Sequence, residues 1–421
     1  MPRNYQKKEK KQYLPDVEQS FYESSFLSAL AGFLDADGSM QLLLTKRQKP
    51  APVRVGSSRK ISSNWVPYEP RIYISLSNSD KDTLETIKET LNGNNKDDTN
   101  AKSKRFCSYK HIFASEKSNE KGEILWHGRD NCLKLLALVG NRLRGPMLSQ
   151  LPIFSAALKL NNCKQPEGIA QYIYLMYLLN SQGQNRSYNL QERLEQNYAV
   201  NEQFASQILF NENAFYDKNQ YILNQSCFNS KLEQLFLEAL KEKDRKEICP
   251  NYFGGYYQGD GSFYFFFRDK VHKVYPVIGF SLTDDFKPII EQLFTFLSNE
   301  ALSFDQQQEM PIFFEKGNLN VKNCCESLIQ DSNSRAISIG KVADRNPGTS
   351  TENKLVTRYT VTNNAFASHV LIPLLDKSLL WGGYKKKYLL VKKASETWAN
   401  KPPKYKEMLI HLYYCMIKYN L

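Results

Sequence analysis

The chain has 421 residues, a net charge of +12 at pH 7 and a pI near 9.1. This length is enough for two or three domains, and so strong a positive balance favours an anionic partner. No apolar run is long enough to span a bilayer, so a transmembrane protein is excluded and no membrane partner is expected. The eight cysteines show no Cys-x-x-Cys spacing, which indicates reduced thiols in an intracellular protein and neither a zinc site nor a disulfide framework.

Residues 1–19 predict a basic arm that lacks the apolar segment of a secretory signal. From residue 20 a helix is expected to run into a ten-residue stretch, LAGFLDADGS, at residues 30–39. A matching stretch, FGGYYQGDGS, lies at residues 253–262. Each copy has small residues at its second and third positions, an aspartate at its eighth and Gly-Ser after it. A pattern that occurs twice predicts two copies of one supersecondary unit.

The small residues of the two stretches remove side-chain bulk, so two helices are expected to approach there almost backbone to backbone. These residues are Ala31, Gly32, Gly254 and Gly255. Gly38 and Gly261 are predicted to close the helices in the left-handed conformation.

Asp37 and Asp260 then lie at helix C-termini, where the helix dipole disfavours a carboxylate. Two such acids brought together repel each other unless a cation lies between them, and Mg²⁺ is usually held by few carboxylates with water and phosphate. A calcium loop starting at Asp35 is not expected, because its sixth and twelfth positions hold Met40 and Lys46 in place of Gly and Glu. The pair therefore predicts a magnesium site.

The first unit is expected to continue with strands at residues 40–47 and 71–77, a helix at 80–91, strands at 105–114 and 123–126, and a helix at 131–142. Apolar and polar residues alternate along 71–77, as in a half-buried strand. The second unit repeats the order, with strands at 262–270, 273–283, 335–345 and 355–362 and helices at 284–298 and 364–375. Each unit is thus predicted to be an α+β antiparallel meander with helices on one face.

The predicted organisation is a basic arm (1–19), a first unit (20–160), an insertion (161–247), a second unit (248–400) and a helical tail (401–421). The insertion is rich in Asn, Gln and Tyr, with helical stretches at 171–179 and 231–241. It is interpreted as an expanded surface linker, although extra DNA contacts or an RNA-binding role remain open. The tail helix, 405–419, is expected to pack on the body.

The stretch at residues 30–39 closely resembles the signature of the LAGLIDADG homing endonucleases and departs from that name only at Phe33-Leu34. The resemblance covers about residues 20–160 and 248–400. It implies two pseudo-symmetric αββαββα units, with the signature helices at their interface and the two sheets forming a saddle for DNA. It also implies a functional monomer that cuts both strands of a long asymmetric DNA duplex with Mg²⁺, leaving staggered ends.

The family's site roles fall on particular residues of this chain. Asp37 and Asp260 would hold the metal, with Ala36 and Gly259 as further metal-contacting residues. A polar residue at the end of the second strand is Asn78 in the first unit, where it is equally well placed to cap the helix near residue 80. A basic residue between the last strand and the last helix is Arg129.

The second unit departs from this pattern. Leu282 occupies the place of Asn78, and no lysine stands where Arg129 does, since Asn363 and Asn364 lie there. The two halves of the active site are therefore expected to be unequal.

Outward strand faces are expected to read DNA, because a sheet ribbon fits the major groove and Arg, Lys, Gln and Asn recognise base edges. The candidates are Gln41, Thr45, Arg47, Arg71, Tyr73 and Ser75 in the first unit, and Tyr264, Arg268, Lys273, Tyr275, Lys341 and Arg345 in the second.

Two other functions share this scaffold. A maturase would bind intron RNA without cutting, and the presence of both acids argues against a purely structural role without excluding a dual one. A DNA-binding regulator usually brings a separate reading domain, and no helix-turn-helix pattern is visible in the tail. The chain ends Tyr419-Asn420-Leu421, without the terminal His-Asn pair of an intein, which favours expression from a group I intron. Family habit implies a chloroplast or mitochondrion.

Overall fold

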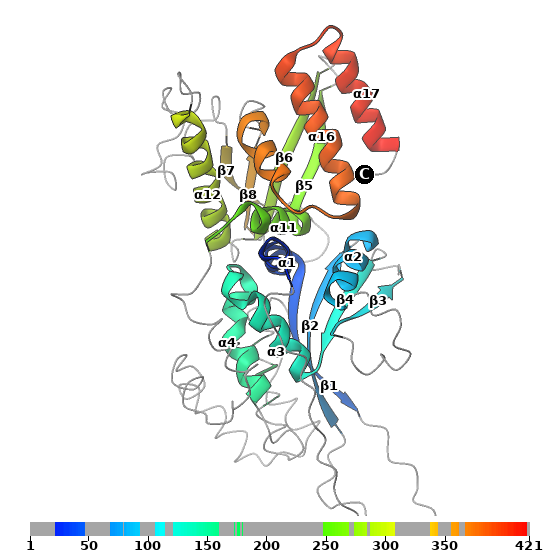
Figure 1. The fold of residues 1–421 in the computed structure, drawn as a ribbon, viewed down its shortest axis with the longest axis vertical. Helices are drawn as coiled ribbons and strands as arrows, with labels where there is room; N and C mark the ends of the chain where they lie inside the picture. Colours follow the sequence, from blue (N-terminus) through cyan, green and yellow to red (C-terminus); the bar gives the residue numbers. More distant parts are fainter. Residues whose placement is uncertain are drawn as a thin grey trace, which may run out of the picture.

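A computed structural model describes residues 22–46, 68–78, 80–92, 106–113, 121–159, 247–268, 273–283, 287–307, 337–343, 355–361 and 367–418, with Tyr172, Leu175, Met176 and Leu179 of the insertion. These parts form two α+β units stacked end to end (Figure 1). Helices α1 (Ser24–Asp37) and α11 (Pro250–Asp260) lie side by side between the units. The predicted fold class is confirmed.

The first unit contains every helix and strand that its sequence predicts. Its strands are β1 (Gly38–Lys46), β2 (Tyr68–Asn78), β3 (Ser108–Ile112) and β4 (Lys121–His127). After α1 its helices are α2 (Lys81–Asn92), α3 (Arg129–Val139), the short 3₁₀ helix η3 (Gly140–Arg142) and α4 (Pro146–Lys159). Helix α4 is not predicted from the sequence, because Pro152 lies inside it and proline usually marks a helix boundary.

The second unit repeats the order. Its strands are β5 (Gly261–Arg268), β6 (Lys273–Thr283), β7 (Ile337–Ala343) and β8 (Leu355–Val361). Its helices are α12 (Lys287–Gln306), the π-helical turn η8 (Ala367–Leu371), α15 (Ile372–Asp376), α16 (Gly382–Asn400) and α17 (Tyr405–Lys418). The tail helix packs on the body as predicted, since Leu409, Leu412 and Met416 of α17 are buried.

Each unit holds one four-stranded antiparallel sheet, with strand order β1-β2-β4-β3 in the first and β5-β6-β8-β7 in the second. The prediction of a simple meander is therefore wrong. The helix between the second and third strands carries the chain past the sheet, so that the third strand forms an edge and the fourth returns beside the second. Because Gly38 pairs with Leu76 and Gly261 with Phe280, the two sheets share one register.

The first sheet buries one face and leaves the other accessible. Along β4, buried and half-exposed positions alternate from Lys121 to Trp126. The buried positions of the sheet carry Met40, Leu42, Ile74, Leu76, Ile124 and Trp126, which belong to the core with α1 and α3. Within the described ranges, no helix combines the length and apolar character needed to cross a membrane.

Gly38 and Gly261 close the signature helices in a way that the sequence does not predict. Both have extended backbones, with φ near −82° and −81°, so the expected left-handed caps are wrong. The chain passes directly from helix into strand at these positions. A Cβ atom at Gly38 would lie 2.2 Å from the Leu34 carbonyl oxygen, so close approach, and not a positive φ, requires glycine here.

The contact between α1 and α11 depends on two of the four predicted interface residues. A Cβ atom on Gly32 would lie 2.1 Å from the Tyr252 carbonyl oxygen, and one on Gly255 would lie 1.9 Å from the Ala29 carbonyl oxygen. Gly254 instead faces Ser378 of its own unit. Ala31 is fully buried in the core. The helices therefore meet backbone to backbone, as predicted, through one glycine from each.

Candidate active site

The two signature aspartates come together where α1 and α11 end. A Cβ atom on Gly259 would lie 2.3 Å from the Ala36 Cβ and 3.3 Å from the Asp37 backbone nitrogen. The residue preceding Asp260 therefore touches the residue preceding Asp37. The structure brings these four predicted residues into one place, at two helix C-termini whose last carbonyl groups lack intrahelical partners.

Asn78 reaches this place from the end of β2. Its side-chain Nδ2 donates a hydrogen bond of 2.7 Å to Asp37 Oδ2, and its Oδ1 accepts one of 2.8 Å from the Asp80 backbone nitrogen. Asn78 is therefore not the cap of α2: its amide group contacts the acid, and its carbonyl oxygen holds the turn before α2. The cap of α2 itself is Asp80, which accepts from the Thr83 nitrogen.

Burial controls the ionisation of both acids. The pKa of Asp260 is raised to about 7, mainly by desolvation and also by the charge of Asp37, against the lowering effect of the nearby Tyr256 hydroxyl. Desolvation also raises the pKa of Asp37, against the bond from Asn78 and the positive charge of Lys121. Two carboxyl groups held close in a poorly solvated place favour protons or a cation between them.

Lys121, at the start of β4, is the basic residue beside Asp37 that the sequence analysis missed. Gly122 pairs with Asn78 across the sheet, which brings the beginning of β4 to the site. Arg129 follows the other end of β4, roughly 20 Å away for a seven-residue strand. Its Nε donates to the Leu158 carbonyl oxygen at 2.8 Å and so ties α3 to α4. The prediction that Arg129 lies beside the acids is wrong, because strand register and not chain order decides which end reaches them.

The corresponding positions of the second unit are apolar. The signature glycines pair with Leu76 in the first sheet and with Phe280 in the second. Asn78 and Leu282 each lie two residues further along the strand, so they occupy corresponding positions. Leu282 pairs with Thr357 as Asn78 pairs with Gly122, which places Val356 at the position of Lys121. The surroundings of Asp37 and Asp260 therefore differ in residue type, as the sequence predicts.

The donor set fits a hard divalent cation. Asp260 Oδ2 is buried and has no hydrogen-bond partner among the described residues. Among the described residues, no three His, Cys, Asp or Glu side chains form a cluster that could hold a metal ion, so a cation here would need further ligands from backbone, water or phosphate. Two carboxylates and the helix-terminal carbonyl groups of Ala36 and Gly259 offer only oxygen, which suits Mg²⁺ or Ca²⁺.

The candidate DNA-reading residues are placed unevenly. Arg71 is exposed, Tyr73 is half-buried and stacks on His127, and Gln41 Nε2 donates to Ser75 Oγ at 2.9 Å. Ser75 is buried, so its hydroxyl supports Gln41 and is not presented to a ligand. Thr45, Tyr264, Arg268, Lys273, Tyr275 and Lys341 occupy strand positions in β1, β5, β6 and β7, whereas Arg47 and Arg345 lie outside the described residues.

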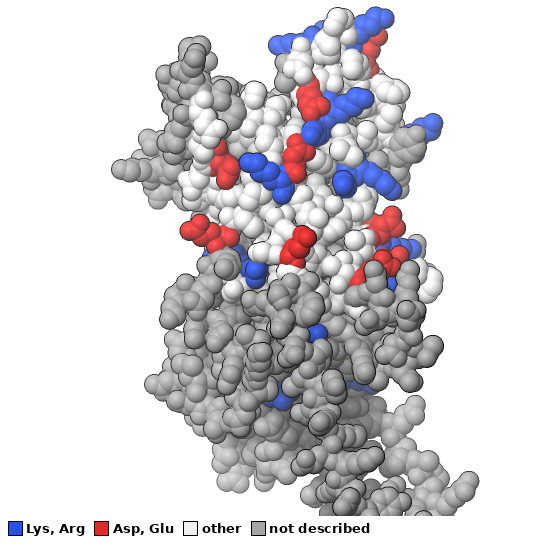
Figure 2. Space-filling model, in the orientation of Figure 1, with Lys and Arg blue, Asp and Glu red and all other residues white. Residues whose placement is uncertain are grey.

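Basic and acidic side chains are mixed on the described part of the face that Figure 2 shows. On the face seen in Figure 2, lysine and arginine side chains gather over α16 and α17 with acidic side chains among them. Lys392, for example, pairs with Asp376 at 2.7 Å. The sheet faces remain candidates because of their residue types.

Comparisons with known proteins agree with this architecture. The LAGLIDADG endonuclease family model matches residues 30–121. No curated protein matches the chain in sequence. Among solved structures, the chain is similar to I-SmaMI bound to uncleaved DNA target in the presence of calcium ions (14% identity, 93% of this chain, 98% of that chain, TM-score 0.52). It is also similar to the LAGLIDADG homing endonuclease I-GzeII in complex with DNA target (13% identity, 92% and 96%, TM-score 0.53).

The chain is similar in fold to a structure of I-SmaMI bound to cleaved DNA as well (14% identity, 92% of this chain, 95% of that chain, TM-score 0.51). At these identities the likeness establishes the fold, and the family match rests on the first unit. The LAGLIDADG endonuclease family model thus matches the first unit, and over more than nine-tenths of the chain the two-unit fold is similar to that of LAGLIDADG homing endonucleases.

Proposed function

We propose that this protein is a site-specific DNA endonuclease that hydrolyses one phosphodiester bond in each strand of a DNA duplex. The observation that carries the proposal is the pair of half-buried carboxyl groups at the touching ends of α1 and α11, with the buried Oδ2 of Asp260 left without a hydrogen-bond partner among the described residues. The fold similarity to proteins described in complex with cleaved and uncleaved DNA supports it. Mg²⁺ is the proposed cation in the cell, and staggered cutting by a monomer is the proposed outcome.

Each residue of the site has a part in this reaction. Asp37 and Asp260 would hold the cation, which supplies activation of the attacking water and stabilisation of the leaving oxygen. Asn78 fixes the orientation of the Asp37 carboxylate through its 2.7 Å hydrogen bond. Lys121 places positive charge near Asp37, where it favours the ionised acid and the phosphate of the substrate. The attacking water bonds to phosphorus and releases one proton to solvent, one P–O ester bond breaks, and the leaving oxygen takes up one proton from solvent.

A cleavage selection tests the proposal. The full chain is incubated with a randomised duplex library and Mg²⁺, and cut ends are sequenced to obtain the target. Wild type is then compared with Asp37→Asn, Asp260→Asn and the control Asp82→Asn, whose side chain is exposed on α2. The expected result is double-strand cutting by wild type and the control, lost in either site variant while DNA binding remains. Cutting that survives both site substitutions, or specific binding to structured intron RNA without any DNA cutting, would overturn the proposal.

A further inference from the structure

Asp80 joins the two units by capping two helices at once. Its Oδ1 accepts a bond of 3.3 Å from the Thr83 nitrogen in the first turn of α2, in the first unit. Its Oδ2 accepts bonds of 2.5 Å and 3.2 Å from the Gly383 and Tyr384 nitrogens, in the first turn of α16 in the second unit. A carboxylate is favoured at each helix N-terminus by the free N–H groups and the dipole.

The approach of α16 to Asp80 is close enough to require glycine. Gly382 has φ of +53°, and a Cβ atom there would lie 2.4 Å from Thr83 Oγ1 and 2.6 Å from Asp80 Oδ2. The preceding Trp381 packs its ring against Phe26 and Phe33 of α1. The start of α16 therefore rests on the first unit, although the rest of the helix belongs to the second.

From Asp80, two hydrogen bonds lead to the candidate metal site in the first unit. The Asp80 nitrogen donates to Asn78 Oδ1 at 2.8 Å, and Asn78 Nδ2 donates to Asp37 Oδ2 at 2.7 Å. Any shift of Asp80 is transmitted to the amide group that orients Asp37.

From Tyr384, one hydrogen bond leads to the other half of the site. Its hydroxyl donates to the carbonyl oxygen of Gly261, the residue that follows Asp260. Its ring packs against Tyr257 of α11 and Phe263 of β5, with centroid distances of 6.2 Å and 5.4 Å. Burial and the charges of Asp37 and Asp260 raise the pKa of the Tyr384 hydroxyl, which is consistent with its place beside both acids.

These contacts close a ring around the two acids, in the order Asp37, Asn78, Asp80, Tyr384, Gly261 and Asp260, completed by the contact of α1 with α11. We infer that Asp80 and Tyr384 are positioning residues that fix the spacing of Asp37 and Asp260 for a divalent cation. The inference rests on the proposed function. It has a physical reason, because the two carboxylates repel each other and Mg²⁺ demands near-ideal geometry from its ligands.

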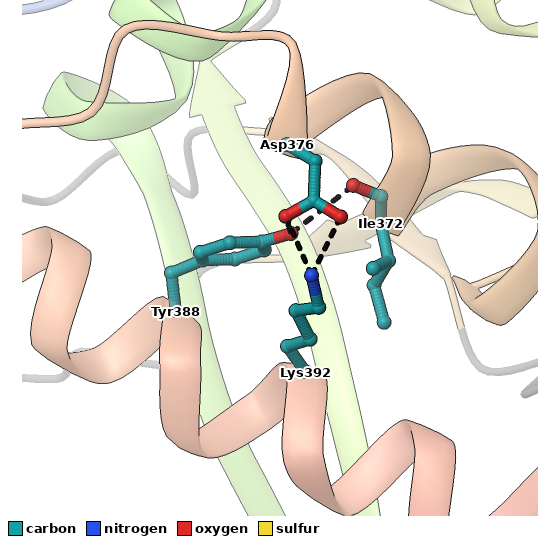
Figure 3. A network of polar contacts seen from close by, with 4 residues as sticks. All are labelled: Ile372, Asp376, Tyr388 and Lys392. Carbon is teal, nitrogen blue, oxygen red and sulfur yellow. Dashed lines mark hydrogen bonds and ion pairs between the residues drawn. The ribbon is translucent and has the colours of Figure 1, made fainter.

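Three variants open the ring in different places. Asp80→Ser keeps a good N-cap for α2 but is too short to reach α16. Tyr384→Phe keeps the ring packing and removes only the bond to Gly261. The double variant removes both links. The matched control is Asp376→Asn, because Asp376 also anchors α16, through Tyr388 Oη and Lys392 Nζ at 2.7–2.8 Å, but makes no contact in the ring of hydrogen bonds described above (Figure 3).

The readout is the affinity of the full chain for Mn²⁺ without DNA, titrated by electron paramagnetic resonance, with thermal unfolding in the absence of metal measured beside it. Each single variant is expected to weaken Mn²⁺ binding roughly tenfold, as for residues that orient metal ligands. The double variant is expected to bind Mn²⁺ only slightly more weakly than either single variant. Breaking one hydrogen bond already frees the spacing of the two acids, so breaking the second adds little. Asp376→Asn is expected to bind Mn²⁺ as wild type does.

Wild-type Mn²⁺ affinity in both single variants would overturn the inference, as would an equal loss in Asp376→Asn, which would reduce the ring to general stabilisation of α16. If Asp80→Ser does not fold, Tyr384→Phe alone decides in the same way. Failure of the proposed function is distinguishable: wild type would then bind no Mn²⁺, or Asp37→Asn and Asp260→Asn would bind it unchanged, and the inference would fall with it.

Discussion

Asp35 and Gln258 occupy the same position in the two signature helices and make different contacts. Asp35 is buried, accepts a bond of 2.6 Å from the Arg144 nitrogen, and accepts one of 2.8 Å from the Tyr252 hydroxyl of the other helix. Gln258 stays within its own unit, where its Oε1 accepts from the Trp381 nitrogen at 2.7 Å. Asp35 thus holds the segment that precedes α4, and Gln258 holds the segment that precedes α16, so each has a structural role.

Asp35 makes stability depend on pH. Burial raises its pKa from 3.8 to about 6, although the bonds from Arg144 and Tyr252 oppose this. Because the folded-state pKa is raised, the protonated acid contributes stability that is complete below pH 4 and is lost as pH rises through about 6. Asp35→Asn stays neutral. The variant should gain about 3 kcal/mol in free energy of unfolding relative to wild type between pH 4 and pH 7, for a shift of about two pKa units.

Urea unfolding followed by tryptophan fluorescence at several pH values measures this difference. Asp82→Asn, whose side chain is exposed on α2, is the matched control. Parallel stability curves for wild type and Asp35→Asn would contradict the prediction.

Asp260 makes metal binding compete with protons. Its pKa is raised to about 7 by burial and then by Asp37, so near neutral pH a large share of the metal-free protein carries a proton there. Since a bound cation requires the ionised acid, the cleavage rate at low Mg²⁺ should rise with pH through about 7. At high Mg²⁺ the midpoint should move to lower pH. Single-turnover rates at two Mg²⁺ concentrations test this, and a midpoint independent of Mg²⁺ would be inconsistent with it.

At the scale of elements, local pattern and long-range pairing contribute differently. The strands of both units and most of their helices, apart from α4 and α16, are predictable, because period-two alternation and the doubled signature are local signals. The strand order is not, since pairing β2 with β4 depends on contacts far apart in the chain. Lys121 is missed for the same reason, whereas Asp37 and Asp260 are found because the signature itself carries them. The ring through Asp80 and Tyr384 has no sequence signal, because its members lie about 300 residues apart.

The α1–α11 contact should not tolerate a single added methyl group. In Gly32→Ala the new Cβ atom would lie 2.1 Å from the Tyr252 carbonyl oxygen. This oxygen belongs to the backbone of α11, so it cannot avoid the clash by a change of side-chain rotamer. The helices must separate, at a cost of about 3 kcal/mol in free energy of unfolding. Urea denaturation measures the change, and cleavage should fall with it because the acids move apart. A variant as stable and as active as wild type would show that the helices do not meet in this way.

At the scale of the molecule, one chain holds two related but unequal units. Asp37 has Asn78 and Lys121 beside it, whereas the positions that correspond in the second unit are Leu282 and Val356. A duplex bound across both units therefore presents its two strands to different surroundings. The chemistry at one strand is expected to be faster than at the other.

This inequality predicts an accumulating nicked intermediate. With a supercoiled plasmid that carries the selected target, one strand should be cut at least about tenfold faster, so open circles appear before linear DNA. Leu282→Asn should shorten the life of the open circle by supplying the missing amide group. Gel densitometry over time separates the two steps. Linear product that forms without an open-circle phase would show that the two strands are cut with equal rates.

The hydrogen bond between Asp35 and Tyr252 also decides which halves recognise each other. The residue of α1 that corresponds to Tyr252 is Ala29, so a pair of two α1 helices would leave each buried Asp35 without its hydroxyl donor. The first unit is thereby discouraged from pairing with its own copy, and the unlike pair is preferred. A chimera that joins one unit of this protein to a unit of a relative must therefore keep Asp35 and Tyr252 together, because they are the acceptor and donor of one hydrogen bond between the units.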